Sequence, residues 1–151
     1  MAQPVYIAVI GGSDIGPETA RLAREVGREV AARGAVLLCG GLGGVMAAAA
    51  QGAQEAGGVS LGILPDGDRV RANPYLTYAI ATNLGHARNV LIAHSADALI
   101  VVDGSHGTIS EAAIALNVTW DLPGLQRADS PEAAVAMAWE AVKGWGSGVR
   151  G

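Results

Sequence analysis

The chain has 151 residues, half of them hydrophobic, with 16% charged residues and a formal net charge of −4. This length and apolar content suit one buried core and exclude a disordered chain. The sparse, slightly acidic charge gives no general electrostatic footprint for nucleic acid or for an acidic membrane surface, so we expect neither as a partner.

The N-terminal half contains two units in which a strand leads into a helix. Residues 5–10 form an apolar, β-branched run that predicts a buried strand, and Pro17 suits the first position of a helix that ends at Gly34. Residues 35–39 predict a second strand, covered on both faces because it lacks alternation. An alanine-rich helix follows, which predicts close helix packing.

The C-terminal half continues the same alternation. Residues 60–64 and 78–81 predict two strands joined by a polar loop. Thr82 or Asn83 can cap a helix over residues 84–95, and residues 98–102 predict the next strand. The remaining elements are a helix over residues 108–116, an edge strand over 118–120, and a helix capped by Ser130 with Pro131 at its first position.

Strands that alternate with helices predict the α/β class, as a single domain built on a doubly wound parallel sheet. We expect the domain to span residues 1–143 and residues 144–151 to form a flexible tail. In such sheets the ligand lies outside the carboxyl ends of the strands.

Two residue types constrain the chemistry and the compartment. Cys39 is the only cysteine, which rules out an intramolecular disulfide and favours a reducing compartment. No signal peptide or apolar segment of membrane-spanning length is visible, so we expect a cytoplasmic protein. Lys143 is the only lysine. A Walker-type phosphate loop and a pyridoxal phosphate Schiff base are therefore excluded, and arginine must supply positive charge.

Three glycine-rich turns follow predicted strands: Gly11-Gly12-Ser13, Gly40-Gly41-Leu42-Gly43-Gly44 and Gly104-Ser105-His106-Gly107-Thr108. Glycines bring backbone N–H groups within reach of a ligand, and helix N-termini favour anions, so the turns predict a phosphate site. The alternative is that the glycines only permit tight turns. Ordinary dinucleotide binding is disfavoured, because Met46 stands where the fingerprint has its third glycine.

Several other residues have two interpretations. Arg88 lies early in an apolar helix, where a cation is disfavoured unless an anion pairs with it, although it could also be a solvated arginine. Glu111 fits a capping box with Thr108 as well as a catalytic role. His106 is more typical of a turn than of a catalyst, and the three histidines have no metal-ligand spacing, so we expect no metal site.

The motifs together resemble the SLOG superfamily of Rossmann-like proteins, in particular small bacterial proteins related to the molybdenum cofactor carrier and to the LONELY GUY phosphoribohydrolases. The resemblance rests on the first two turns, on Gly62-Ile63-Leu64-Pro65 and on Gly85-His86-Ala87-Arg88-Asn89, and it covers residues 5–116. The carrier branch implies binding of a phosphorylated pterin. The old label of lysine decarboxylase finds no support.

The phosphoribohydrolase branch has a Pro-Gly-Gly-x-Gly-Thr-x-x-Glu signature and an Arg-Lys pair, and its arginine and glutamate hydrolyse a nucleotide's N-glycosidic bond. Here the signature reads Asp103-Gly104-Ser105-His106-Gly107-Thr108-Ile109-Ser110-Glu111, and the pair reads Arg88-Asn89. The would-be catalytic residues match, but Asp103, Ser105 and Asn89 depart from the pattern. Asp103 adds a negative charge near the expected anion.

Our first hypothesis is a binding protein for a nucleotide or a phosphorylated, molybdopterin-type ligand, with no other cofactor required. The ligand-binding residues expected are Gly11, Gly12, Ser13, Gly40, Gly41, Leu42, Gly43, Gly44, Met46, Arg88, Asn89, Gly104, Ser105, His106, Gly107 and Thr108.

Two other functions stay open. The first alternative is a nucleoside 5′-monophosphate phosphoribohydrolase that uses Arg88 and Glu111. The second is a sensor or scaffold that binds no small molecule. The alanine-rich helices and sparse charge, together with the resemblance, predict a homo-oligomer, either a dimer or a tetramer.

Overall fold

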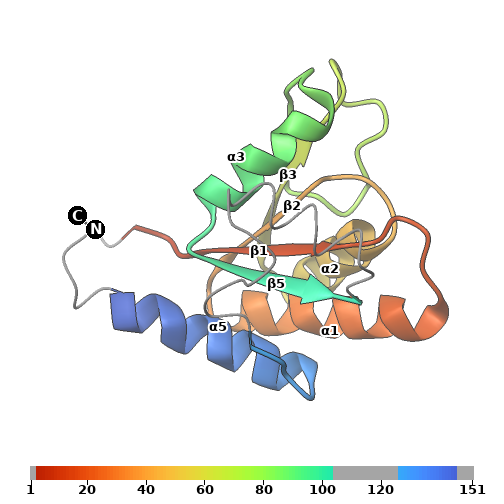
Figure 1. Cartoon of the computed structure of the whole chain (residues 1–151). Coiled ribbons are helices and arrows are strands. Elements are labelled where there is room, and N and C mark those ends of the chain that lie inside the picture. Colours follow the sequence, from red (N-terminus) through yellow and green to blue (C-terminus); the bar gives the residue numbers. More distant parts are fainter. Residues whose placement is uncertain (1–2, 104–125, 146–151) are drawn as a thin grey trace.

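The computed structural model describes residues 3–103 and 126–145, which fold around one five-stranded sheet (Figure 1). The strands are β1 (Tyr6–Gly11), β2 (Val36–Cys39), β3 (Val59–Leu64), β4 (Tyr78–Ala81) and β5 (Ala98–Val102). The helices are α1 (Pro17–Ala32), α2 (Val45–Glu55), the 3-10 helix η1 (Gly85–Ala87), α3 (Arg88–Ser95) and α5 (Pro131–Trp145). All five strands were expected from the sequence, with bounds that differ by at most one residue.

The sheet is parallel throughout, in the order β4-β3-β2-β1-β5. The chain leaves β1 toward β2 and later returns to β5 on the opposite side of β1. In the register, Ile7 pairs with Leu37 on one side and with Ala98 on the other. The predicted doubly wound parallel sheet is confirmed, and its switch point lies between β1 and β5.

Helices cover both faces of the sheet, but unequally. In Figure 1, α1 and α5 lie below β1 and β5 and α3 lies above them. Helix α2 packs against α1 in the same core. The larger core, on the side of α1, α2 and α5, includes the fully buried residues Ile7, Val9 and Leu37. The smaller core, on the side of α3, consists of Ala8, Leu38, Ile63 and Ile92. Consecutive residues of β1 and β2 therefore enter opposite cores, which is why these strands show no alternation.

Helices α1 and α2 cross with their backbones in contact. A Cβ atom at Gly27 of α1 would overlap the carbonyl oxygen of Ala49, and a Cβ atom at Gly52 of α2 would overlap that of Arg24. Residues without side-chain bulk are needed at such a crossing because a Cβ atom on either helix would push the backbones apart. The close packing predicted from the alanine-rich helix is confirmed.

The start of α3 differs from the expectation. The helix was expected from residue 84 with a cap from Thr82 or Asn83, but α3 begins at Arg88, after η1, and has no side-chain cap. Thr82 instead donates its hydroxyl to the Leu64 carbonyl (2.6 Å) and accepts the N–H of Leu84 (3.3 Å). Thr82 thus ties the chain after β4 to the end of β3, which competes with capping.

The C-terminal helix begins as expected. The Ser130 hydroxyl oxygen accepts the N–H of Ala133 (3.1 Å), and Pro131 occupies the first helical position. Helix α5 continues through Trp145, so the predicted domain boundary at residue 143 falls inside it. Within residues 3–103 and 126–145, no helix is both long enough and apolar enough to cross a membrane.

Candidate functional site

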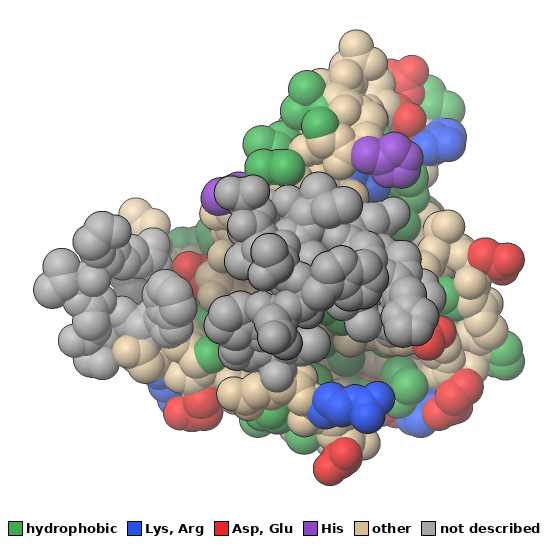
Figure 2. Space-filling view, viewed as in Figure 1, with side chains coloured by type: hydrophobic (Ala, Val, Ile, Leu, Met, Phe, Trp, Pro, Cys, Tyr) green, Lys and Arg blue, Asp and Glu red, His purple; other side chains and the backbone are tan. Residues whose placement is uncertain are grey.

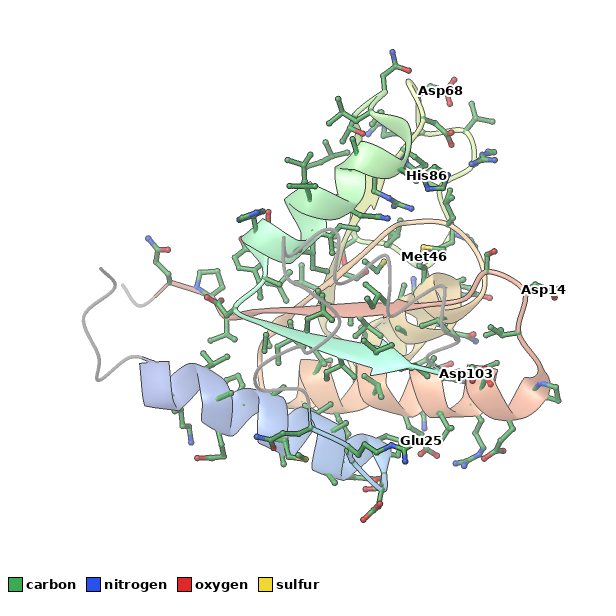
Figure 3. The ribbon with its side chains drawn as sticks, viewed as in Figure 1. Asp14, Glu25, Met46, Asp68, His86 and Asp103 are labelled. Atoms are coloured by element: carbon green, nitrogen blue, oxygen red, sulfur yellow. The ribbon has the colours of Figure 1, made fainter. Side chains whose placement is uncertain are left out.

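The carboxyl ends of the strands form one edge of the molecule, at the right of Figure 1. The first glycine turn follows β1, the second follows β2, and Asp103 follows β5. Figure 3 shows Asp14 and Asp103 on this side of the molecule, with Met46 nearer the centre and His86 and Asp68 above. The first two turns therefore meet at one edge, beside the switch point, as expected for a ligand site in such a sheet.

The first two turns are packed directly against each other. The N–H of Val45, which opens α2, donates to the carbonyl oxygen of Gly12 (3.0 Å). Gly44 has φ +66, and a Cβ atom there would overlap Gly12 O and lie 2.5 Å from the Cα of Ser13. Gly44 must therefore be glycine both for its backbone conformation and for this contact.

At Gly43, neither the backbone conformation nor a described neighbour requires glycine. Gly43 is exposed, its φ is not positive, and no atom of residues 3–103 or 126–145 lies within 4 Å of the position that a Cβ atom would take. The structural interpretation of the glycines, that they only permit tight turns, therefore accounts for Gly44 but not for Gly43. Among the described residues, none covers the backbone at Gly43 on that side.

Arg88 is buried, with 9% of its surface exposed, at the start of α3. Its Nη1 donates to the carbonyl oxygens of Gly40 (2.5 Å) and Ile63 (2.6 Å), which lie at the ends of β2 and β3. The alternative of a solvated arginine is wrong. Backbone carbonyl dipoles hold this cation at a helix N-terminus that disfavours it, so a positive charge is fixed beside the second turn.

Two neighbours complete the surroundings of Arg88. A Cβ atom at Gly40 would overlap Arg88 Nη1 and lie 2.6 Å from the Sδ of Met46, which is also buried. Cys39 is fully buried, and burial raises the pKa of its thiol to about 11, although the Gly41 N–H and the charge of Arg88 act in the opposite direction. Cys39 is therefore a buried thiol and not an activated nucleophile.

The second turn is also held by Asn73, a residue that the sequence did not single out. Asn73 lies in the connection between β3 and β4 and is 9% exposed. Its N–H donates to the Gly41 carbonyl (2.9 Å), and its Nδ2 donates to the Leu42 carbonyl (3.0 Å). Its Oδ1 accepts the N–H of Tyr75 (3.1 Å). The only signal in the sequence was the turn-forming pair Asn73-Pro74.

Asp103 lies where the sequence placed it, next to the switch point, in a left-handed conformation with φ +54. Its Oδ2 accepts the hydroxyl of Thr19, in the first turn of α1 (3.0 Å). A carboxylate is favoured near a helix N-terminus. Asp103 is one of the residues that differ from the phosphoribohydrolase signature, and its carboxylate faces the first turn of α1.

The remaining candidate residues are placed as follows. Gly11 is packed so closely that a Cβ atom would lie 2.5 Å from Val45 Cγ2, while Ser13 is exposed and Asn89 is half-buried beside Arg88. Gly104 to Thr108 and Glu111 lie outside the described residues. In the part of the chain that the structure describes, no three His, Cys, Asp or Glu side chains are grouped so as to hold a metal ion.

Known proteins are similar to this chain in sequence and in fold. A protein from Archaeoglobus fulgidus is 53% identical over 112 residues, which are 74% of each chain. The molybdenum cofactor binding protein from Rippkaea orientalis is 37% identical with a TM-score of 0.73, over 78% of this chain and 73% of that one. A molybdenum cofactor carrier protein from Chlamydomonas reinhardtii is 29% identical with a TM-score of 0.82, over 94% and 99%.

The model of the SLOG cluster4 family matches residues 4–141, which is nearly the whole chain. This match agrees with the resemblance read from the motifs. The chain belongs to the SLOG cluster4 family.

Proposed function

We propose that this protein binds a phosphorylated small molecule, either a nucleotide or a molybdopterin-type ligand, at the carboxyl edge of the sheet. The observation that carries the proposal is the contact between the first two glycine turns, with the Arg88 charge fixed beside the second. Backbone amides and one guanidinium are suitable partners for phosphate oxygens. The similarity to proteins described as binding or carrying the molybdenum cofactor supports the same class of ligand.

Two features of the carboxyl edge of the sheet suit a phosphorylated ligand. The open position at Gly43 lets a ligand oxygen approach the backbone closely. A buried positive charge, in a chain with few cations, attracts a phosphorylated ligand without attracting nucleic acid in general. No other cofactor is required, and the third turn would contribute further contacts.

Native mass spectrometry of freshly purified protein tests this proposal, together with molybdenum analysis after expression in cells that make the molybdenum cofactor. The expected result is a retained mass, and calorimetry with AMP should show binding in protein from which that mass has been removed. Gly43→Ala should fold normally but bind AMP more weakly, because its methyl group occupies the approach to the backbone. Gly144→Ala is the matched control, since its methyl group also meets no described atom outside its helix within 4 Å but lies in α5.

The same samples separate binding from hydrolysis. If the protein binds AMP and releases neither adenine nor ribose 5-phosphate, it acts as a binding protein. Release of these products that is abolished in Glu111→Gln would overturn the binding interpretation in favour of the phosphoribohydrolase. Absence of any retained mass and of any AMP or inorganic phosphate binding would leave only the sensor or scaffold.

We also propose that the protein works as a homodimer or larger assembly in the cytoplasm, with a second copy on the α3 side of the sheet. Tyr78 and Ile80 of the edge strand β4 pair in register with Leu61 and Ile63, which face that side. The exposed large hydrophobic residues on this side are Val59, Tyr78, Ile80, Leu84, Val90 and Leu91. Figure 2 shows hydrophobic side chains gathered over α3.

Charge favours a second copy as the occupant of this face. Arg88 is the only charged residue of α3, and it is buried, so two copies can meet around a two-fold axis without repulsion between like charges. The buried free thiol of Cys39 is compatible with a reducing compartment. We expect Ile80→Glu to lower the mass measured by light scattering, and an unchanged mass would remove this face from the interface.

A further inference from the structure

The second glycine turn has an unusual pattern of carbonyl contacts. Three successive carbonyl oxygens, those of Gly40, Gly41 and Leu42, each accept a hydrogen bond from a distant part of the chain. The donor is Arg88 for the first and Asn73 for the other two. The carbonyl groups of this turn therefore point toward Asn73 and Arg88, which follow β3 in the chain.

The planarity of the peptide unit fixes where the N–H groups point. In a trans peptide the N–H of one residue is directed opposite to the C=O of the preceding residue. The Gly41 N–H is directed to the sulfur of Cys39. The N–H groups of Leu42 and Gly43 follow the two carbonyls held by Asn73, so they point away from the connection between β3 and β4.

Neither of these two N–H groups donates a hydrogen bond within residues 3–103 and 126–145. The position of a Cβ atom on Gly43 is open, so nothing in the described part of the chain crowds that side of the turn. Backbone N–H groups are strong donors that seek an acceptor, and two successive ones form a concave anion site.

We infer that Asn73 is a positioning residue that turns the amides of Leu42 and Gly43 toward an anionic oxygen of the ligand, such as a phosphate oxygen. The inference rests on the proposed function and adds to it the pair of donors and the side chain that orients them. Asn73 does not touch the ligand. It acts through the two peptide units that it holds.

The chemistry of asparagine suits this role. The Asn73 Oδ1 accepts the Tyr75 N–H, which fixes the side-chain amide so that Nδ2 faces the Leu42 carbonyl. Asn73→Asp keeps the shape and the bond from Tyr75 but cannot donate to Leu42. It also places a carboxylate oxygen against that carbonyl, which repels the peptide unit and lets it rotate.

The first experiment needs no variant. In ¹⁵N-labelled protein, titration with inorganic phosphate and then with AMP should shift the amide protons of Leu42 and Gly43 downfield. If amides of the first turn, Gly12 and Ser13, shift while those of Leu42 and Gly43 do not, the inference about Asn73 is overturned although the proposed function survives. If no amide at the strand ends responds to either probe, the proposed function itself fails.

The second experiment compares two variants of the same connection. Asn73→Asp should weaken AMP binding by about tenfold or more and remove the shifts at Leu42 and Gly43. Thr77→Val is the control, because the Thr77 hydroxyl accepts the Ser60 N–H (3.0 Å) at the other end of the connection and does not contact the turn. It should lower the melting temperature without changing the AMP affinity. Equal losses of affinity in both variants, or none in Asn73→Asp, would contradict the positioning role.

Discussion

The guanidinium group of Arg88 rests on the backbone of Gly40, with Nη1 2.5 Å from the Gly40 carbonyl oxygen and no room for a Cβ atom between them. A charged side chain that begins α3 is thereby fastened to the ends of β2 and β3. The positive charge of the candidate site is consequently also part of the folded framework.

Removal of Arg88 should reduce stability as well as binding. Arg88→Leu leaves the carbonyl oxygens of Gly40 and Ile63 without their donor in a buried place, so we expect the free energy of unfolding to fall by about 2–4 kcal/mol. Urea denaturation measures this change. Arg69→Leu, in an exposed loop, should change stability by no more than about 0.5 kcal/mol. A similarly small effect at Arg88 would show that its carbonyl bonds do not hold the site.

The crossing of α1 and α2 should not tolerate a methyl group. Gly52→Ala sets a Cβ atom against the carbonyl of Arg24, which is backbone and cannot move alone. We expect the free energy of unfolding to fall by about 1–3 kcal/mol or more, as in other overpacked interiors. Gly144→Ala adds the same group where no described residue outside its helix lies within 4 Å, and its melting temperature should equal or exceed that of the wild type. An unchanged melting temperature in Gly52→Ala would mean that the helices can separate freely.

Acid should weaken the link between the same two helices. Hydrogen bonds from Arg24 and Arg28 of α1 lower the pKa of the Glu55 carboxyl, at the end of α2, from 4.5 to about 2. Because the folded-state pKa lies below that of the unfolded chain, the contribution is complete above about pH 4.5 and is lost as the pH falls toward 2. Since these side chains are partly exposed, salt should reduce the effect.

Comparison of wild type and Glu55→Gln by denaturation between pH 2 and 6 measures this contribution. The difference in stability between the two proteins should shrink as the pH falls. A difference that stays constant over the whole range would contradict the assignment of the shifted pKa to Glu55.

Alkali should act through Cys39. Burial raises the pKa of this thiol from 9.0 to about 11, so between these values the unfolded chain ionises its thiol while the folded chain does not. The unfolded state then binds fewer protons, and stability falls as the pH rises through this window. Cys39→Ala should flatten this dependence. In the native protein at pH 8 the thiol should react with a thiol reagent only as fast as the protein unfolds.

The sequence predicted the five strands and the sheet edge at which the first two turns meet. Those predictions succeeded because local patterns determine them, as in the unbroken apolar run of β2, whose residues Leu37, Leu38 and Cys39 are fully buried. The expected cap at Thr82 failed because its hydroxyl found a partner on β3, 18 residues earlier. The preference of threonine for helix starts does not take account of a hydrogen-bond partner that is distant in the sequence.

For the candidate site, glycine spacing and the placement of Arg88 likewise predicted which segments meet but not the contacts of their side chains. Arg88 was expected to neutralise a ligand or to be solvated, and its bonds to Gly40 and Ile63 depend on contacts 48 and 25 residues away. Asn73 was overlooked because a polar loop residue becomes informative only once its partners are known.

The backbone contact between α1 and α2 has a consequence for how a ligand would be received. Each helix starts just after one of the first two turns. Because α1 and α2 are in close backbone contact at Gly27 and Gly52, the two turns are held at a fixed separation. A receptor that is preorganised in this way loses little conformational entropy on loading and needs no closing motion of these two segments. Release of the proposed ligand would then depend on competition from another binding partner, and would not require the first two turns to separate.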